Sequence, residues 1–168
     1  MRFLAMLLAC AACSRSIQFD VQKTVQATAT SASFADAAVD LQQIDEVSSH
    51  WLEDFSGAQI TSAELVVGAP TANNTTQKLS GRVTLAMVGA PLSGEADAVL
   101  ATFTDLPIAA GQKLLLASSP EADRFMSSRL SVRVVGTRDP RFTLGVRFTP
   151  EGTADVPLTL TLHVQASY

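Results

Sequence analysis

Cysteine is almost missing from this chain of 168 residues, and aromatic and charged residues are scarce. The two cysteines are Cys10 and Cys13, so the remainder of the chain can hold no disulfide, no cysteine-ligated metal and no cysteine nucleophile. Charged residues make up 17% and hydrophobic residues 47%, which excludes intrinsic disorder, because disordered chains combine low hydrophobicity with high net charge. The formal net charge of −4 argues against nucleic acid as a partner, since nucleic-acid binders are usually basic. The length fits one globular domain with a sizeable core.

Sequence motifs for catalysis are also missing. The chain has no Gly-x-Ser-x-Gly elbow, no P-loop, no His-Glu-x-x-His and no Gly-x-Gly-x-x-Gly. His50 and His163 are the two histidines, and no run of alternating acidic residues suggests a calcium loop. A spatial Ser–His–Asp triad stays open, because such triads need no local signature. We therefore expect a protein that is not an enzyme, with no catalytic residues, no metal site and no cofactor.

The N-terminus has the layout of a secretory signal. Arg2 precedes the apolar run Phe3–Ala9, which leads into Cys10-Ala11-Ala12-Cys13. The run is too short to cross a bilayer as a helix.

This segment resembles the signal peptides of bacterial lipoproteins, in which small residues precede a cysteine that is lipidated. Cys13 follows two alanines, whereas Cys10 has the leucine that the family prefers three positions earlier. We expect lipidation at Cys13, with Cys10 as the alternative. The resemblance then implies a cleaved signal over residues 1–12, a lipidated cysteine with a short tether over 13–16, and a domain over 17–168.

The family resemblance also implies a location. A lipoprotein of this kind is held in the cell envelope by its N-terminal lipid. The residue after Cys13 is Ser14, not the aspartate that retains lipoproteins in the inner membrane of well-studied enteric bacteria. The resemblance therefore favours the outer membrane.

Strict alternation of apolar and polar residues predicts long strands at both ends of the domain, over Ile17–Thr30 and Val156–Tyr168. Apolar residues recur every three or four positions between Leu41 and Phe55, which predicts a helix over about Leu41–Asp54. Further strands are predicted over Gln59–Val67, Leu79–Val88, Ala96–Thr104, Lys113–Ala117, Arg129–Gly136 and Arg141–Thr149, with a helical turn near Pro120–Ser127.

Seven or eight short strands separated by turns predict a mainly β protein, an antiparallel β-sandwich with one or two short helices. The gaps are too short for the helical crossovers that a parallel sheet requires. The pattern is similar to that of the immunoglobulin-like sandwiches of exported bacterial lipoproteins. This similarity is architectural and implies no function.

Arginine is concentrated near the C-terminal end. Six arginines and four acidic residues follow Ala122, whereas acidic residues dominate before it. If a hairpin turn lies near Asp139, then Arg129, Arg133, Arg141 and Arg147 share one outer sheet face. Such a face would suit an anionic partner, for example anionic lipid or an acidic envelope protein. The simpler interpretation is a solvated face whose charges protect a sheet edge.

These features together favour a non-enzymatic, lipid-anchored envelope protein that acts as a structural or interaction module at the membrane surface. The alternative is a lipoprotein module that binds a small ligand or a glycan. A concave pocket with converging polar groups would favour the alternative.

Overall fold

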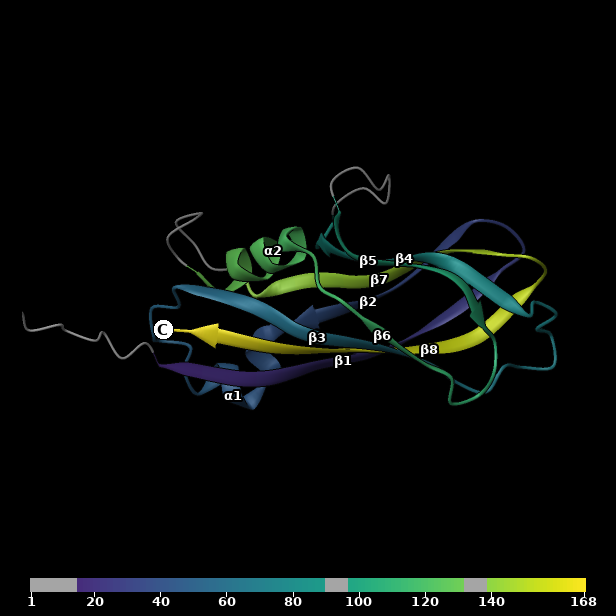
Figure 1. Cartoon of the computed structure of the whole chain (residues 1–168). Helices are drawn as coiled ribbons and strands as arrows, with labels where there is room; N and C mark the ends of the chain where they lie inside the picture. Colours follow the sequence, from purple (N-terminus) through teal and green to yellow (C-terminus); the bar gives the residue numbers. More distant parts are fainter. Residues whose placement is uncertain (1–14, 90–96, 132–138) are drawn as a thin grey trace, which may run out of the picture.

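The computed structural model describes residues 15–89, 97–131 and 139–168. Its elements in chain order are β1 (Ser16–Ala29), β2 (Ser33–Asp40), the 3-10 turn η1 (Leu41–Gln43), α1 (Asp45–Ser48), β3 (Gly57–Val67), β4 (Lys78–Met87), β5 (Ala98–Pro107), β6 (Lys113–Leu116), α2 (Pro120–Leu130), β7 (Arg141–Pro150) and β8 (Ala154–Ser167). The strands of this described part form two antiparallel sheets that pack face to face (Figure 1). The predicted mainly β, antiparallel sandwich is therefore confirmed.

The two longest strands are those with the strictest alternation. β1 and β8 pair antiparallel over their full length, from Ser16 opposite Ser167 to Ala29 opposite Ala154. Their apolar residues point into the sandwich and are almost fully buried, while the polar residues between them face solvent. The predicted alternation of both strands is confirmed, and Lys23 is the one charged residue on the apolar side of β1.

The strand order defines the topology. Sheet A has the order β1-β8-β3-β6 and sheet B the order β2-β7-β4-β5. The first four strands thus pair with the last four in reverse, β1 with β8, β2 with β7, β3 with β6 and β4 with β5. This is a long antiparallel ribbon rolled into two layers, which is a jelly roll.

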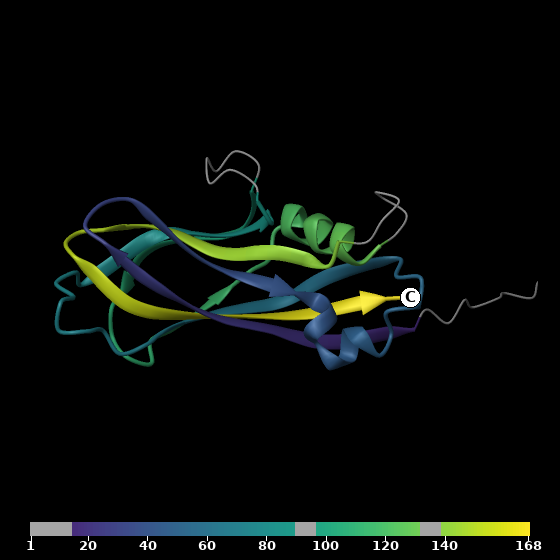
Figure 2. The ribbon, with the colours of Figure 1, turned by 180° about the vertical axis from the view of Figure 1, so that it is seen from behind.

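The immunoglobulin-like order expected from the sequence is not the one found. In an immunoglobulin domain the first two strands belong to the same sheet, whereas β1 and β2 lie in different sheets here. Alternation predicts which residues face inward, but the sheet that a strand joins depends on pairings between distant segments. Figure 2 shows β1 turning over into β2 at the end of the sandwich opposite the C-terminus.

The helix predicted over Leu41–Asp54 is wrong, and the strand before it was not predicted. That strand is β2, and the expected helix is reduced to η1 and the four-residue α1. Alanines at most inward positions of β2 gave the strand a weak apolar signal. Leu41, Val47 and Phe55 are nevertheless fully buried, so the apolar stripe was correctly assigned to the core.

Helix α2 is longer than the predicted helical turn. Ser119 caps its N-terminus by accepting a hydrogen bond from the backbone N–H of Ala122, and Pro120 occupies its first turn, where the missing N–H costs nothing. Arg129 and Leu130 are its last residues, so the strand predicted over Arg129–Gly136 is wrong at its start. Residues 132–136 of that prediction lie outside the described residues.

The edge of β3 is shared between a strand and a helix. β6 pairs only with Ala63–Val66, and α2 lies beside the earlier part of β3. Ser127 Oγ bonds both the N–H and the C=O of Ala58, and Asp123 Oδ1 accepts from the N–H of Ile60. The side chains of α2 thus satisfy backbone groups that would otherwise be a free sheet edge.

Among the residues described, no helix is both long and apolar enough to cross a membrane.

Candidate functional site

Both candidate lipidation sites, Cys10 and Cys13, lie outside the described residues. The first described residue, Arg15, is already hydrogen-bonded to the end of the chain: its N–H donates to the carbonyl of Tyr168 at 3.1 Å, and the Tyr168 N–H donates to the Arg15 carbonyl at 2.8 Å. Sheet pairing therefore begins two residues after Cys13. The end of the sandwich at which β1 starts is also the end at which β8 stops (Figure 1).

The four arginines predicted to share a face do not do so. Arg129 lies on α2 and is buried, with its Nε on Ser128 Oγ and its guanidinium over the ring of Phe125. Arg133 lies outside the described residues. Arg141 and Arg147 are both on the outer face of β7, but they are six positions apart along the strand, roughly 20 Å. The predicted anionic-partner face is thus not assembled by the described members.

Arg141 forms an exposed local pair at the start of β7. Its Nε and its backbone N–H both donate to Asp139 Oδ1, at 3.1 Å each. These two hydrogen bonds lower the pKa of the Asp139 carboxyl, and the positive charges of Arg141 and Arg129 lower it further. The same carboxylate raises the pKa of Arg141. Both side chains are exposed, so this pair contributes little to stability.

Arg147 is held in a cluster on the outer face of sheet B. Its Nε and Nη2 donate to Asp97 Oδ2 at 3.2 and 2.8 Å, and the Asp97 side chain is only 2% exposed. The guanidinium carbon lies 4.6 Å from the centre of the Phe34 ring, a distance at which a cation is attracted to the ring face. Gly145 makes room for that ring, because a Cβ there would lie 2.5 Å from two of its carbons.

A hollow of about 450 Å³, here called the arginine hollow, adjoins this cluster. Its lining consists of Ala32, Ser33, Phe34, Gly81, Arg82, Thr102, Arg147, Phe148 and Thr149. The register places Arg82 directly opposite Arg147 on one side and Thr102 on the other. Gly81 allows the close approach of β4 to β7, since a Cβ there would meet the carbonyl oxygen of Arg147 at 2.1 Å.

Sequence reasoning missed Arg82 as a site residue. It lies 65 positions from Arg147 in the chain, in the region where acidic residues outnumber basic ones. Only the β4–β7 pairing brings the two arginines together.

A second hollow, here called the edge hollow, also has a volume of about 450 Å³ and lies between the edge strands β5 and β6. Its lining includes Phe103, Leu106, Leu114 and Leu115, and Leu115 is 78% exposed.

One set of residues in the described structure is aligned like a Ser–His–Asp triad. Asp20, His163 and Ser62 face one another across β1, β8 and β3, and His163 Nδ1 lies 2.7 Å from Asp20 Oδ1. In the described structure no hydrogen bond joins His163 to Ser62, and the His163 and Asp20 side chains are 45% and 62% exposed. A nucleophile needs a base within hydrogen-bond reach and a site that excludes water. These three residues are aligned like a catalytic triad, but they meet neither requirement. Within the described ranges, no group of three or more His, Cys, Asp or Glu residues could hold a metal ion.

Comparisons with known proteins identify no family. No protein-family model matches this chain, and no curated protein matches it. Solved structures that resemble it include a decameric BFDV capsid protein (17% identity, 90% of this chain and 99% of that one, TM-score 0.43), turnip yellow mosaic virus (14%, 92% and 94%, 0.39) and the capsid of Ralstonia phage GP4 (14%, 96% and 90%, 0.38). Scores this low carry no inference about function.

Proposed function

We propose that this protein is a non-enzymatic, lipid-anchored protein of the bacterial cell envelope, located in the outer membrane, that acts as a structural or interaction module at the membrane surface. The observation that carries the proposal is the cysteine that ends the N-terminal segment, two residues before sheet pairing begins at Arg15. An anchor at this position leaves almost no free chain between the lipid and the sandwich. The domain would therefore rest close to the membrane.

The strand pairing of the domain supports the role of a structural or interaction module. The pairing of β1 with β8 ties together both ends of the domain, so the anchored end is built into sheet A along its full length. A pull on the anchor would then be resisted by many backbone hydrogen bonds acting together. Such an arrangement suits a protein whose task is to hold a position.

The experiment tests the anchor directly. The full chain is expressed in a bacterium with radiolabelled palmitate, together with the variants Cys13→Ser and Cys10→Ser. We expect label and membrane association in the wild type and in Cys10→Ser, and a soluble, unlabelled, exported protein from Cys13→Ser. Loss of label in Cys10→Ser alone would move the anchor to the alternative cysteine. Unchanged membrane association without label in every form would contradict the proposal.

The edge hollow favours a second candidate function, the binding of a small apolar ligand. Its volume is within the range of small-molecule sites, and its lining combines leucine side chains with a few polar groups such as Gln112. Phe103 is the one aromatic residue in this lining and it is buried. A glycan would need exposed rings on which to stack, so the edge hollow suits a small apolar molecule better than a sugar.

A further inference from the structure

We propose that the arginine hollow binds a phosphate group, presented as free phosphate or as a small soluble phosphomonoester. The proposal concerns the outer face of sheet B, and only its choice of a soluble phosphate over a lipid headgroup rests on the proposed lipid anchor. It differs from the face expected from the sequence, because its leading residue is Arg82.

Positive charge is in excess around the arginine hollow. Arg82 and Arg147 lie directly opposite each other on neighbouring strands, where like charges destabilise a sheet. Asp97 neutralises Arg147 through two hydrogen bonds, but no ion pair or hydrogen bond is found for the Arg82 side chain among the described residues. Among the described residues no acidic side chain lines the hollow, and Asp36 on the nearby strand β2 lies outside the lining. Within the part of the chain that the structure describes, the positive charge of Arg82 thus has no counter-charge in a concave site.

The lining of the arginine hollow is rich in hydrogen-bond donors. A guanidinium carries five N–H groups in a planar fork that matches two oxygens of a phosphate. Around Arg82, the lining adds the hydroxyls of Ser33, Thr102 and Thr149, which have no hydrogen-bond partner in the described structure. A phosphate, with oxygens in three or four directions, can accept from a fork and from several hydroxyls at once. A carboxylate has only two oxygens and would leave part of this lining unused.

The side chain of Arg147 is already held in place before any ligand binds. Arg147 is held by Asp97 on one side and by the Phe34 ring on another, so its guanidinium has little freedom to lose when a ligand binds. Gly81 contributes no side chain to fill the hollow, and the backbone of β7 approaches it closely. Both arginines also lie on neighbouring paired strands, β4 and β7, and strands position side chains more accurately than loops do.

The position of the hollow favours a soluble phosphate over a lipid headgroup. Phe34, which pairs with Arg147, is the second residue of β2, and β2 begins where β1 has already run its whole length. Fourteen strand residues span roughly 45 Å, so the hollow is far from the residues that precede β1. A membrane at that end of the sandwich would not reach it.

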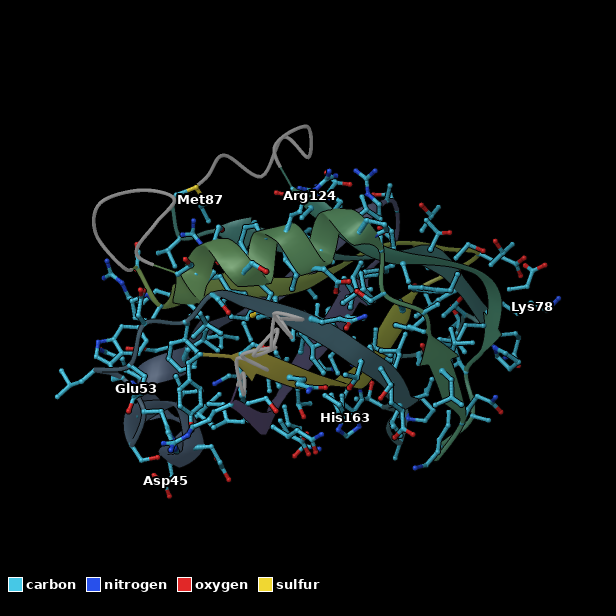
Figure 3. All side chains as sticks on the ribbon, turned by 60° about the vertical axis from the view of Figure 1, so that its left-hand side comes forward. Asp45, Glu53, Lys78, Met87, Arg124 and His163 are labelled. Atoms are coloured by element: carbon cyan, nitrogen blue, oxygen red, sulfur yellow. The ribbon has the colours of Figure 1, made fainter. Side chains whose placement is uncertain are left out.

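The test is titration of the purified full chain with inorganic phosphate at constant ionic strength, followed by calorimetry and by amide chemical shifts of Gly81 and Thr102. Arg82→Gln should weaken phosphate binding by ~10-fold or more, because it removes charge-assisted hydrogen bonds. Arg82→Lys should fall between Arg82→Gln and the wild type, since it keeps the charge and loses the fork. The matched control is Arg124→Gln, an exposed arginine on α2 with the same change in net charge (Figure 3); it should bind phosphate as the wild type does.

Three results would overturn the proposal. The first is no saturable phosphate binding by the wild type, and the second is equal weakening in Arg82→Gln and Arg124→Gln. A third arm uses vesicles of phosphatidylglycerol: binding to them that Arg82→Gln abolishes, without any response to inorganic phosphate, would assign the hollow to a lipid headgroup. The wild type and each variant are compared by circular dichroism, and Arg82→Lys serves as the test variant if Arg82→Gln does not fold.

Discussion

At the scale of single residues, Asp155 joins three segments at the end of the sandwich away from the start of β1. Its Oδ1 accepts from Gln26 Nε2 at 2.7 Å and from Thr28 Oγ1 at 3.2 Å, and its Oδ2 accepts from Thr71 Oγ1. The hydrogen bond from Thr71 is the largest cause that lowers the pKa of Asp155, followed by the one from Gln26. One half-buried carboxylate thus ties β1 and the loop before β4 to the start of β8.

The lowered pKa predicts how Asp155 contributes to stability as the pH changes. Because the folded pKa is below the unfolded value of 3.8, the stabilising contribution is present above pH 3.8 and is lost as the pH falls through the folded pKa. Asp155→Asn should lower the melting temperature at pH 7. The difference between wild type and variant should shrink as the pH falls from 3.8 through the folded pKa, because the carboxyl of the unfolded wild type takes up its proton first and that of the folded protein last. Thermal unfolding monitored by circular dichroism between pH 7 and pH 2.5 measures both effects.

The control for this prediction is Asp36→Asn, which removes an exposed aspartate that has no hydrogen-bond or ion-pair partner among the described residues. Its melting temperature should follow that of the wild type across the pH range. A difference between wild type and Asp155→Asn that stays constant down to pH 2.5 would show that the carboxylate charge is not what stabilises this end.

At the scale of elements, α2 protects the edge of a sheet. Ser127 and Asp123 bond the backbone of β3 at Ala58 and Ile60, in the part of β3 that β6 does not cover. Ser127 Oγ serves as donor to one backbone group and acceptor from another, at 2.8 and 2.9 Å. This double role allows one hydroxyl to replace the contacts that a neighbouring strand would make.

Ser127→Ala should therefore destabilise the protein by about 1–3 kcal/mol, because it leaves two partly buried backbone groups of Ala58 without a partner. It should also speed hydrogen exchange at the Ala58 amide. Urea unfolding measures the first effect and native-state exchange the second. Arg124→Ala, an exposed change on the same helix, should alter neither. Exchange at Ala58 that is as slow in the variant as in the wild type would contradict this role of α2.

At the scale of the whole molecule, the proposed anchor and the start of the sheet are separated by Ser14 alone, if Cys13 carries the lipid. A flexible insert of about 20 Gly/Ser residues between Ser14 and Arg15 would add a linker of roughly 25 Å on average. We expect the insert to reduce cross-linking to partners at the membrane surface and to increase cleavage of the domain by added protease. The lipid itself should remain.

The matched control places the same insert between Ala109 and Ala110, two exposed residues in the loop between β5 and β6. This variant lengthens the chain by the same amount but leaves the distance between lipid and sandwich unchanged. Cross-linking and cleavage that respond equally to both inserts, or to neither, would mean that closeness to the membrane is not part of how this protein works.

The sequence by itself determined the secondary structure wherever burial follows a strict period. β1 and β8 alternate over 14 residues each, so their inward and outward faces could be assigned without knowing their partners. β2 was missed because its small apolar residues gave little contrast between faces. The helical turn predicted near Pro120–Ser127 is the first part of α2. The last part of α2 was predicted as a strand, because Arg129 and Leu130 also fit the alternation of a strand.

Only the tertiary structure decided the topology and the arginine hollow. Both depend on pairings between residues far apart in the chain: β1 with β8 makes the roll, and β4 with β7 sets Arg82 against Arg147. A local pattern reports whether a side chain is buried, because burial imposes a period on the chain. It carries no record of the neighbouring strand, because many different partners satisfy the same backbone hydrogen bonds. The residues that meet on one face are therefore known only when the strands have been paired.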